Sequence, residues 1–104
     1  MPDDRVRTRE VDDLICALLS LRDADEAYAL LIDLCTIREI QDMAQRLEVA
    51  RRLYAGEHYT AIQELTGASA TTISRVSKSL HYGADGYVRV LARMSGEDSP
   101  APAE

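Results

Sequence analysis

Apolar side chains recur at helical spacing along most of the chain. Between Glu10 and Leu21 they form one stripe, made of Val11, Leu14, Ile15, Leu18 and Leu19. Positions three and four apart lie on one side of an α-helix, so the stripe predicts an amphipathic helix over this segment. Asp23, followed three residues later by Glu26, is a typical helix start and predicts a second helix running to about Leu34.

The same start signal occurs once more, at Thr36 and Glu39, and opens a long third helix. Gly56 is a plausible C-cap for this helix, because glycine readily adopts the left-handed backbone that ends many helices. The apolar positions that continue the stripe up to this point are Ile37, Ile40, Met43, Ala44, Leu47, Ala50 and Leu53.

The stretch AIQELTGASATTISRV, residues 61–76, predicts two short helices joined by a tight turn. Gly67 suits the left-handed conformation of such a turn, and the Ser69 hydroxyl can cap the second helix. This pattern predicts a helix-turn-helix over about residues 60–81, whose second helix would enter the DNA major groove. The side chains expected to face inward are Ile62, Leu65, Ile73 and Val76.

The residues after the helix-turn-helix complete the predicted architecture. A break at residues 83–86 precedes a last short helix, indicated by Tyr87, Val88, Leu91 and Met94. No strand pattern occurs, so the sequence predicts an all-α fold of about six helices. We expect a flexible N-terminus over residues 1–8, a helical domain over 9–94, and a disordered acidic tail over 95–104.

Composition and residue spacing exclude several classes of protein. Cys16 and Cys35 lack metal-ligand spacing and are expected to be small buried thiols, while His58 and His81 have no ligand partner nearby. No metal site and no catalytic arrangement is predicted, so we do not expect an enzyme. No apolar run could span a membrane, and the N-terminal MPDDRVRTRE is charged rather than signal-like, which predicts a cytoplasmic protein without a membrane partner.

The net charge of −6 is unevenly distributed along the chain. Residues 1–34 carry four arginines and nine acidic residues, and residues 94–104 carry three acidic residues and no basic one. Residues 35–93 carry eight basic and six acidic residues. The segment with the helix-turn-helix is therefore net positive, which permits a face that binds DNA.

The apolar stripes of the first two predicted helices favour a dimer. These helices are short, and stripes of this kind bury well against a second copy of the chain. Helix-turn-helix proteins commonly dimerise so that two recognition helices meet successive major grooves, about 34–36 Å apart.

From about Leu18 to Met94 the chain resembles the tryptophan-repressor superfamily, most closely its YerC/YecD-type branch. The matching segments are LYAGEHYTAI at the end of the long helix, ELTGASATTISRVSKSL, and the following HYGADGY. The resemblance implies an intertwined helical homodimer. It also implies a bacterial transcription regulator that binds a double-stranded DNA operator, often a repressor of amino-acid biosynthesis genes, associated with the nucleoid when bound.

The motif assigns DNA contacts to the exposed side of the predicted recognition helix. Ala70 and Thr71 would lie closest to the base edges, where their methyl groups could touch a thymine methyl, and Arg75 could reach a guanine. Arg51 and Arg52 could add charge near the DNA backbone, although plain surface arginines are the alternative. The complete set of expected contacts is Ser69, Ala70, Thr71, Thr72, Ser74, Arg75 and Lys78.

The resemblance also implies an effector pocket between the long helix and the recognition helix. Its polar residues would be matched here by Thr36, Arg46, Arg75 and Ser79. Two arginines form a suitable clamp for a carboxylate. Val76 stands where the repressor has glycine, and Asp33 stands at an apolar pocket position, so both disfavour tryptophan. We therefore expect a smaller or cationic amino acid such as histidine, or no effector; Arg46 and Arg75 could instead pair with Glu39, Asp42 or Glu48.

Two functional hypotheses remain at this point. The first is a dimeric, sequence-specific DNA-binding regulator. The second is a helical interaction module that has kept the fold without specific DNA binding, which the acidic balance and the short side chains at Ala70 and Thr71 would allow.

Overall fold

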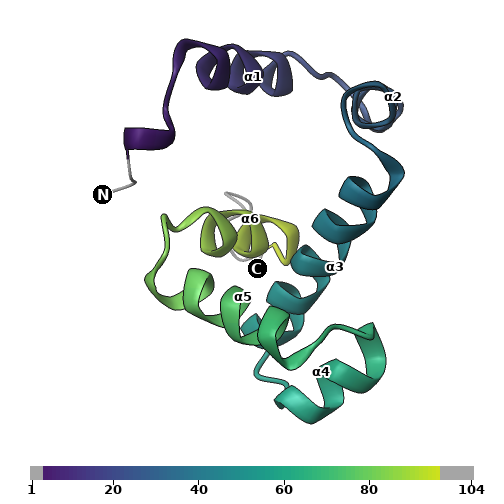
Figure 1. The fold of residues 1–104 in the computed structure, drawn as a ribbon, viewed down its shortest axis with the longest axis vertical. Helices are drawn as coiled ribbons and strands as arrows, with labels where there is room; N and C mark the ends of the chain where they lie inside the picture. The colour runs from purple at the N-terminus through teal and green to yellow at the C-terminus, as the bar shows by residue number, and fades with distance from the viewer. Residues whose placement is uncertain (1–3, 97–104) are drawn as a thin grey trace. The chain divides into compact units, whose positions relative to one another are not determined.

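The computed structural model describes residues 4–96, and these residues form helices and connecting turns without any strand (Figure 1). The elements, in chain order, are η1 (Asp4–Val6), α1 (Arg9–Leu19), α2 (Ala24–Leu34), α3 (Ile37–Tyr54), α4 (Tyr59–Thr66), α5 (Ala70–Tyr82) and α6 (Gly86–Met94). The predicted all-α fold of six helices is confirmed. No helix in this described part is long and apolar enough to cross a bilayer.

The outermost residues of both expected flexible segments, 1–3 and 97–104, lie outside the described part. Inside it, η1 is a short 3-10 helix, and Ser95 follows the last turn of α6, where its backbone N–H donates to the carbonyl of Leu91. The flexibility of residues 1–8 and of the tail stays a prediction.

The chain divides into two units, one up to residue 42 and one from residue 43 onward. In the first unit, α1 and α2 begin at side-chain caps: the Thr8 hydroxyl accepts from the backbone N–H of Val11, and the Asp23 carboxylate accepts from that of Glu26. The start of α2 after Asp23 is confirmed. α1 ends at Leu19, two residues before the expected Leu21, and the hydroxyl of its C-cap Ser20 donates to the Ala17 carbonyl at 2.7 Å.

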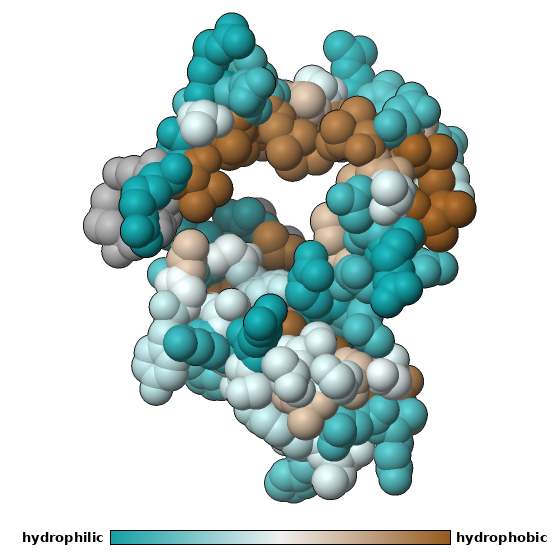
Figure 2. Space-filling view, viewed as in Figure 1, coloured by the Kyte–Doolittle hydropathy of each residue, from teal (hydrophilic) through white to brown (hydrophobic). Residues whose placement is uncertain are grey.

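Neither α1 nor α2 contains a buried residue. Their hydrophobic side chains gather along both helices, as Figure 2 shows, yet Leu18 is 45% exposed and Leu19 is 79% exposed. The thiol of Cys16 is exposed as well, so the expectation that it is buried was wrong. The reason is that the first unit has no core of its own for this side chain to enter.

The second unit holds the hydrophobic core. The residues that form it are Val49, Ala50, Ile62, Ala68, Ile73, Val76, Leu80 and Leu91, from α3, α4, α5, α6 and the turn between α4 and α5. Ile62, Ile73 and Val76 were predicted to face inward and do. Leu65 was predicted to face inward but is 63% exposed, because Thr66, one helical turn after Ile62, takes the inward position on this short helix.

Both predicted ends of α3 are confirmed by hydrogen bonds. The Thr36 hydroxyl accepts from the backbone N–H of Glu39 at 3.0 Å, and the Glu39 carboxylate accepts from that of Thr36 at 2.8 Å. At the other end, Gly56 adopts φ 88° and its N–H donates to the Leu53 carbonyl. The next N–H, of Glu57, donates to the Arg52 carbonyl, which completes a Schellman motif.

Candidate nucleic-acid interface and the adjoining pocket

The turn between α4 and α5 has the conformation of a helix-turn-helix. Gly67 ends α4 with φ 74°, and its N–H donates to the Gln63 carbonyl at 2.9 Å. Ser69 then caps α5, because its hydroxyl accepts from the backbone N–H of Thr72 at 3.1 Å. The left-handed glycine and the serine cap predicted from the sequence are both confirmed. α5 ends at Tyr82, one residue after the expected His81.

The two faces of α5 differ sharply. Ile73, Val76 and Leu80 are buried against the core of the second unit. Of the seven residues assigned to DNA, Thr72 is half-buried, and the six that are exposed are Ser69, Ala70, Thr71, Ser74, Arg75 and Lys78. The structure thus leaves the expected DNA-contacting side of α5 open, in the arrangement a major-groove helix requires.

The charge of this helix suits an anionic partner. α5 contains no acidic residue, and Arg75, Lys78 and His81 lie along it. None of the ion pairs found among residues 4–96 includes Arg75 or Lys78. The positive end of the helix dipole lies at the same N-terminal turns that carry Ala70 and Thr71. The cations of the open face therefore have no carboxylate partner among the described residues.

Two hydroxyl groups at the start of α5 are hydrogen-bonded to each other. The Ser69 hydroxyl donates to the Thr72 hydroxyl oxygen at 3.1 Å while it accepts from the Thr72 N–H. Thr72 keeps its own hydroxyl hydrogen for another acceptor. A phosphate oxygen at this helix start would be such an acceptor.

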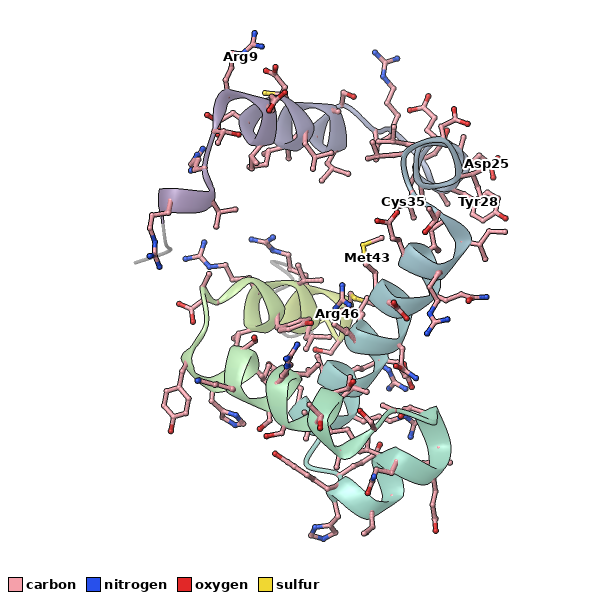
Figure 3. All side chains as sticks on the ribbon, viewed as in Figure 1. Arg9, Asp25, Tyr28, Cys35, Met43 and Arg46 are labelled. Carbon is pink, nitrogen blue, oxygen red and sulfur yellow. The ribbon has the colours of Figure 1, made fainter. Side chains whose placement is uncertain are left out.

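A cavity of about 310 Å³ lies beside this face, inside the second unit. Arg46 on α3, labelled in Figure 3, lines it together with Arg75, Val76 and Ser79 of α5 and Tyr87 of α6. Two guanidinium groups and two hydroxyl groups offer enough donors to bind a carboxylate. Tyr87 was not among the predicted pocket residues, and its position in the segment HYGADGY was the available signal.

Four of the six predicted effector residues meet in this cavity. Asp33 and Thr36 instead belong to the first unit, where Asp33 is exposed and Thr36 caps α3. Val76 is 2% exposed, so its branched side chain occupies core volume at the floor of the cavity. A valine at this position reduces the space available to a large aromatic ring.

The three acidic residues proposed as alternative partners of Arg46 and Arg75 all have other partners. The Glu39 carboxylate accepts from the Thr36 N–H, and Asp42 pairs with Arg38 at 3.5 Å. Glu48 pairs with Arg51 at 2.6 Å and with Arg52 at 2.8 Å. Among the described residues no ion pair includes Arg46.

Arg51 and Arg52 form an ionic network at the end of α3. Besides Glu48, Arg52 binds the carboxylate of Glu57 at 3.0 Å, so the network joins the helix to the loop before α4. The hydrogen bond from Arg51 lowers the pKa of Glu48 below its ordinary value, and the bond from Arg52 acts in the same direction. Hydrogen bonding to Glu48 and Glu57 raises the pKa of Arg51 and Arg52, respectively. The network connects the end of α3 to the loop that precedes the helix-turn-helix.

The described part of the chain contains no cluster of three or more His, Cys, Asp or Glu that could hold a metal ion. Its histidines and cysteines therefore form no metal site there. His58 lies at the start of α4 without a side-chain cap bond. His81 Nδ1 lies 2.8 Å from the Ser77 carbonyl oxygen, a bond in which the ring nitrogen donates.

Comparison with known proteins places this helix-turn-helix in a family. The family model of the Trp repressor protein matches residues 9–95. YerC of Bacillus subtilis (strain 168), itself uncharacterized, is 52% identical over 91 residues, which is 88% of either chain.

Two solved structures are also similar over almost their whole length. A TrpR-like protein from Eubacterium eligens ATCC 27750 has a TM-score of 0.85 at 49% identity, over 89% of this chain and 96% of the other. A candidate Trp repressor from Staphylococcus aureus has a TM-score of 0.85 at 42% identity, over 91% and 95% of the two chains. With its six helices, its capped helix-turn-helix and these matches, the chain belongs to the Trp repressor protein family.

Proposed function

We propose that this protein is a homodimeric, sequence-specific DNA-binding regulator of transcription, a repressor of amino-acid metabolism genes on the bacterial chromosome. The observation that carries the proposal is the open face of α5, which has a capped N-terminus, unpaired cations and no carboxylate. Family membership supports the same class of function.

The side chains on this face make two kinds of contact with DNA, to base edges and to phosphate groups. Ala70 and Thr71 stand at the first turn of α5, where short side chains allow close approach to base edges and their methyl groups suit thymine. Lys78 and the hydroxyl of Thr72 contact phosphate, which fixes the register of the helix on the duplex. Arg75 reaches either a guanine or the pocket beside it, and its place in the cavity lining favours the pocket.

The homodimer is supported by the first unit. α1 and α2 have 11 residues each and bury none of them, which leaves their apolar stripes in need of a covering surface. A second copy supplies that surface and, in the same step, presents two α5 helices to successive major grooves.

Selection of bound sequences from a random duplex pool tests this function. We expect recovery of a two-fold symmetric site, bound with an affinity that falls steeply as salt rises. Lys78→Ala should weaken binding to all sequences and reduce the salt slope by about one. Thr71→Val keeps the methyl group and should retain more selectivity than Thr71→Asp. Affinity that never exceeds that for random duplex would favour the alternative, a helical interaction module.

The pocket supports an amino-acid effector smaller than tryptophan. Arg46 and Arg75 would hold its carboxylate, Ser79 and Tyr87 would supply further polar contacts, and Val76 would limit the side chain it accepts.

Calorimetry with a panel of amino acids tests the effector. We expect one small or cationic amino acid to bind the wild type and to lose affinity in Arg46→Ala. Arg89→Ala, which removes an exposed arginine of α6 outside the cavity lining, serves as the matched control and should bind normally. Absence of heat for every amino acid at millimolar concentration would leave a DNA-binding regulator without an effector.

A further inference from the structure

Gln45 on α3 is bonded directly to the turn of the helix-turn-helix. Its side-chain amide Nε2 donates to the backbone carbonyl of Thr66 at 3.2 Å, across 21 residues of sequence, and the contact is partly buried. Thr66 is the last residue of α4, so its carbonyl has no partner one turn further along the helix. The amide of Gln45 satisfies this carbonyl from outside the helix.

Thr66 joins three hydrogen bonds at this point. Its hydroxyl donates to the Ile62 carbonyl at 2.6 Å and accepts from the backbone N–H of Ala68 at 3.1 Å. Together with the bond from Gln45, these contacts tie the end of α4, the turn and α3 to one another. α5 begins two residues after Ala68, so these contacts hold the backbone that leads directly into its N-terminus.

Arg46, the neighbour of Gln45, lies beside α5. Arg46 lines the cavity with Arg75 and Ser79, which lie on the middle of the recognition helix. One turn of α3 therefore lies close to the recognition helix in two ways: Gln45 bonds to the last residue of α4, and Arg46 lines the pocket beside α5. Neither the motif nor the family comparison assigns a role to Gln45.

We propose that Gln45 is a positioning residue that holds the helix-turn-helix turn against α3 and thereby sets the placement of the base-reading end of α5. The proposal rests on the DNA-binding function above. Specific recognition depends on placing Ala70 and Thr71 accurately at base edges, whereas non-specific binding depends on charge and tolerates small shifts. Loss of the Gln45 amide should therefore reduce selectivity rather than overall attraction to DNA.

The test compares Gln45→Leu and Gln45→Glu with the wild-type protein. Leucine removes the donor, and an ionised glutamate keeps the shape but can only accept. Gln41→Leu and Gln41→Glu are matched controls, because Gln41 is an exposed glutamine on the same helix. We expect both Gln45 variants to lose about fivefold or more in the ratio of operator affinity to random-duplex affinity, while both Gln41 variants keep the wild-type ratio. The affinity for random duplex should stay at the wild-type level in Gln45→Leu, and the added negative charge should lower it in Gln45→Glu no more than in Gln41→Glu.

The ratio of specific to non-specific affinity separates positioning from folding. A variant that merely unfolds in part loses both affinities equally, so an unchanged ratio in both Gln45 variants would overturn the proposal. Amide hydrogen exchange gives a readout that needs no DNA: the Ala68 N–H should exchange faster in Gln45→Leu than in Gln41→Leu. Equal protection of this amide would also contradict the proposal. Failure of the wild type to select any sequence would overturn the proposed function and this inference together.

Discussion

A single glycine determines how the chain leaves the recognition helix. The N–H of Gly83 donates to the Ser79 carbonyl at 2.9 Å, which brings the two backbones together. A Cβ added at Gly83 would lie 2.3 Å from that carbonyl oxygen and 3.1 Å from its carbon. Both contacts are with backbone, which has little freedom to move. Gly86, three residues later, has open space around its position for a Cβ.

Gly83→Ala is therefore expected to destabilise the protein by about 1–3 kcal/mol, the usual effect of an added group that forces the neighbouring backbone to shift. The substitution should also displace Ser79, which lines the pocket, and should therefore weaken the binding of any effector there. Gly86→Ala is the control, and should be neutral or stabilising by up to about 1 kcal/mol because alanine restricts the unfolded chain. Urea unfolding of the three proteins measures the difference. Equal stability of the two variants would contradict this account of Gly83.

At the scale of the elements, α3 is capped at both of its ends. The reciprocal bonds of Thr36 and Glu39 start it, and the left-handed Gly56 ends it. Glu48 and Arg52 lie in its last turns, and the bond from Arg52 to Glu57 continues the ionic network into the loop. Because α4 begins just beyond this loop, the network helps to fix the direction in which the helix-turn-helix departs.

The lowered pKa of Glu48 makes part of this stability depend on pH. A carboxyl group whose pKa is lower in the folded state stabilises that state above its ordinary pKa, about 4.3, and loses this contribution as the pH falls through its folded value. The unfolding free energy of the wild type should thus fall more steeply than that of Glu48→Gln as the pH drops below about 4.3. The effect should be small and should shrink in high salt, because the pairs are partly exposed.

Denaturant unfolding between neutral and acidic pH measures this slope. Glu64→Gln, on the exposed surface of α4 and outside the network, is the control and should follow the wild type. Identical slopes for the wild type and Glu48→Gln would show that the network does not contribute to folding.

On the scale of the whole molecule, the two units differ in how they are stabilised. The second unit has a core that draws residues from α3, α4, α5 and α6. The first has two helices of 11 residues, and isolated helices of that length are marginal in water. The apolar side chains of α1 and α2 therefore need to be covered from outside their own unit. The proposed dimer would meet this need.

If the dimer covers these stripes, the midpoint of thermal unfolding should rise with protein concentration, because association stabilises the folded state by mass action. Leu18→Glu places a charge on the stripe of α1 and should shift the mass in solution from dimer toward monomer. Leu65→Glu changes a leucine that is 63% exposed on α4, and this control should remain a dimer. Light scattering over a range of concentrations distinguishes the dimer from the monomer for each protein. A wild type that is monomeric at every concentration would contradict the dimer.

The sequence by itself determined the features that depend on neighbours within one helical turn. The caps at Asp23, Thr36 and Ser69 and the left-handed turns at Gly56 and Gly67 were all predicted correctly. Each involves a side chain and a backbone group at most four residues apart, or the freedom of one glycine. The all-α class and the place of the recognition helix followed from these signals and from the apolar spacing.

Only the tertiary structure decided which residues from distant segments meet. Val49 is fully buried although it lay outside the predicted stripe, and Leu65 is exposed although the spacing placed it inside. Tyr87 enters the pocket, and Gln45 reaches Thr66 across 21 residues. Helical periodicity defines a face but not the angle at which another helix packs on it. That angle emerges when α3, α4, α5 and α6 pack together around the core.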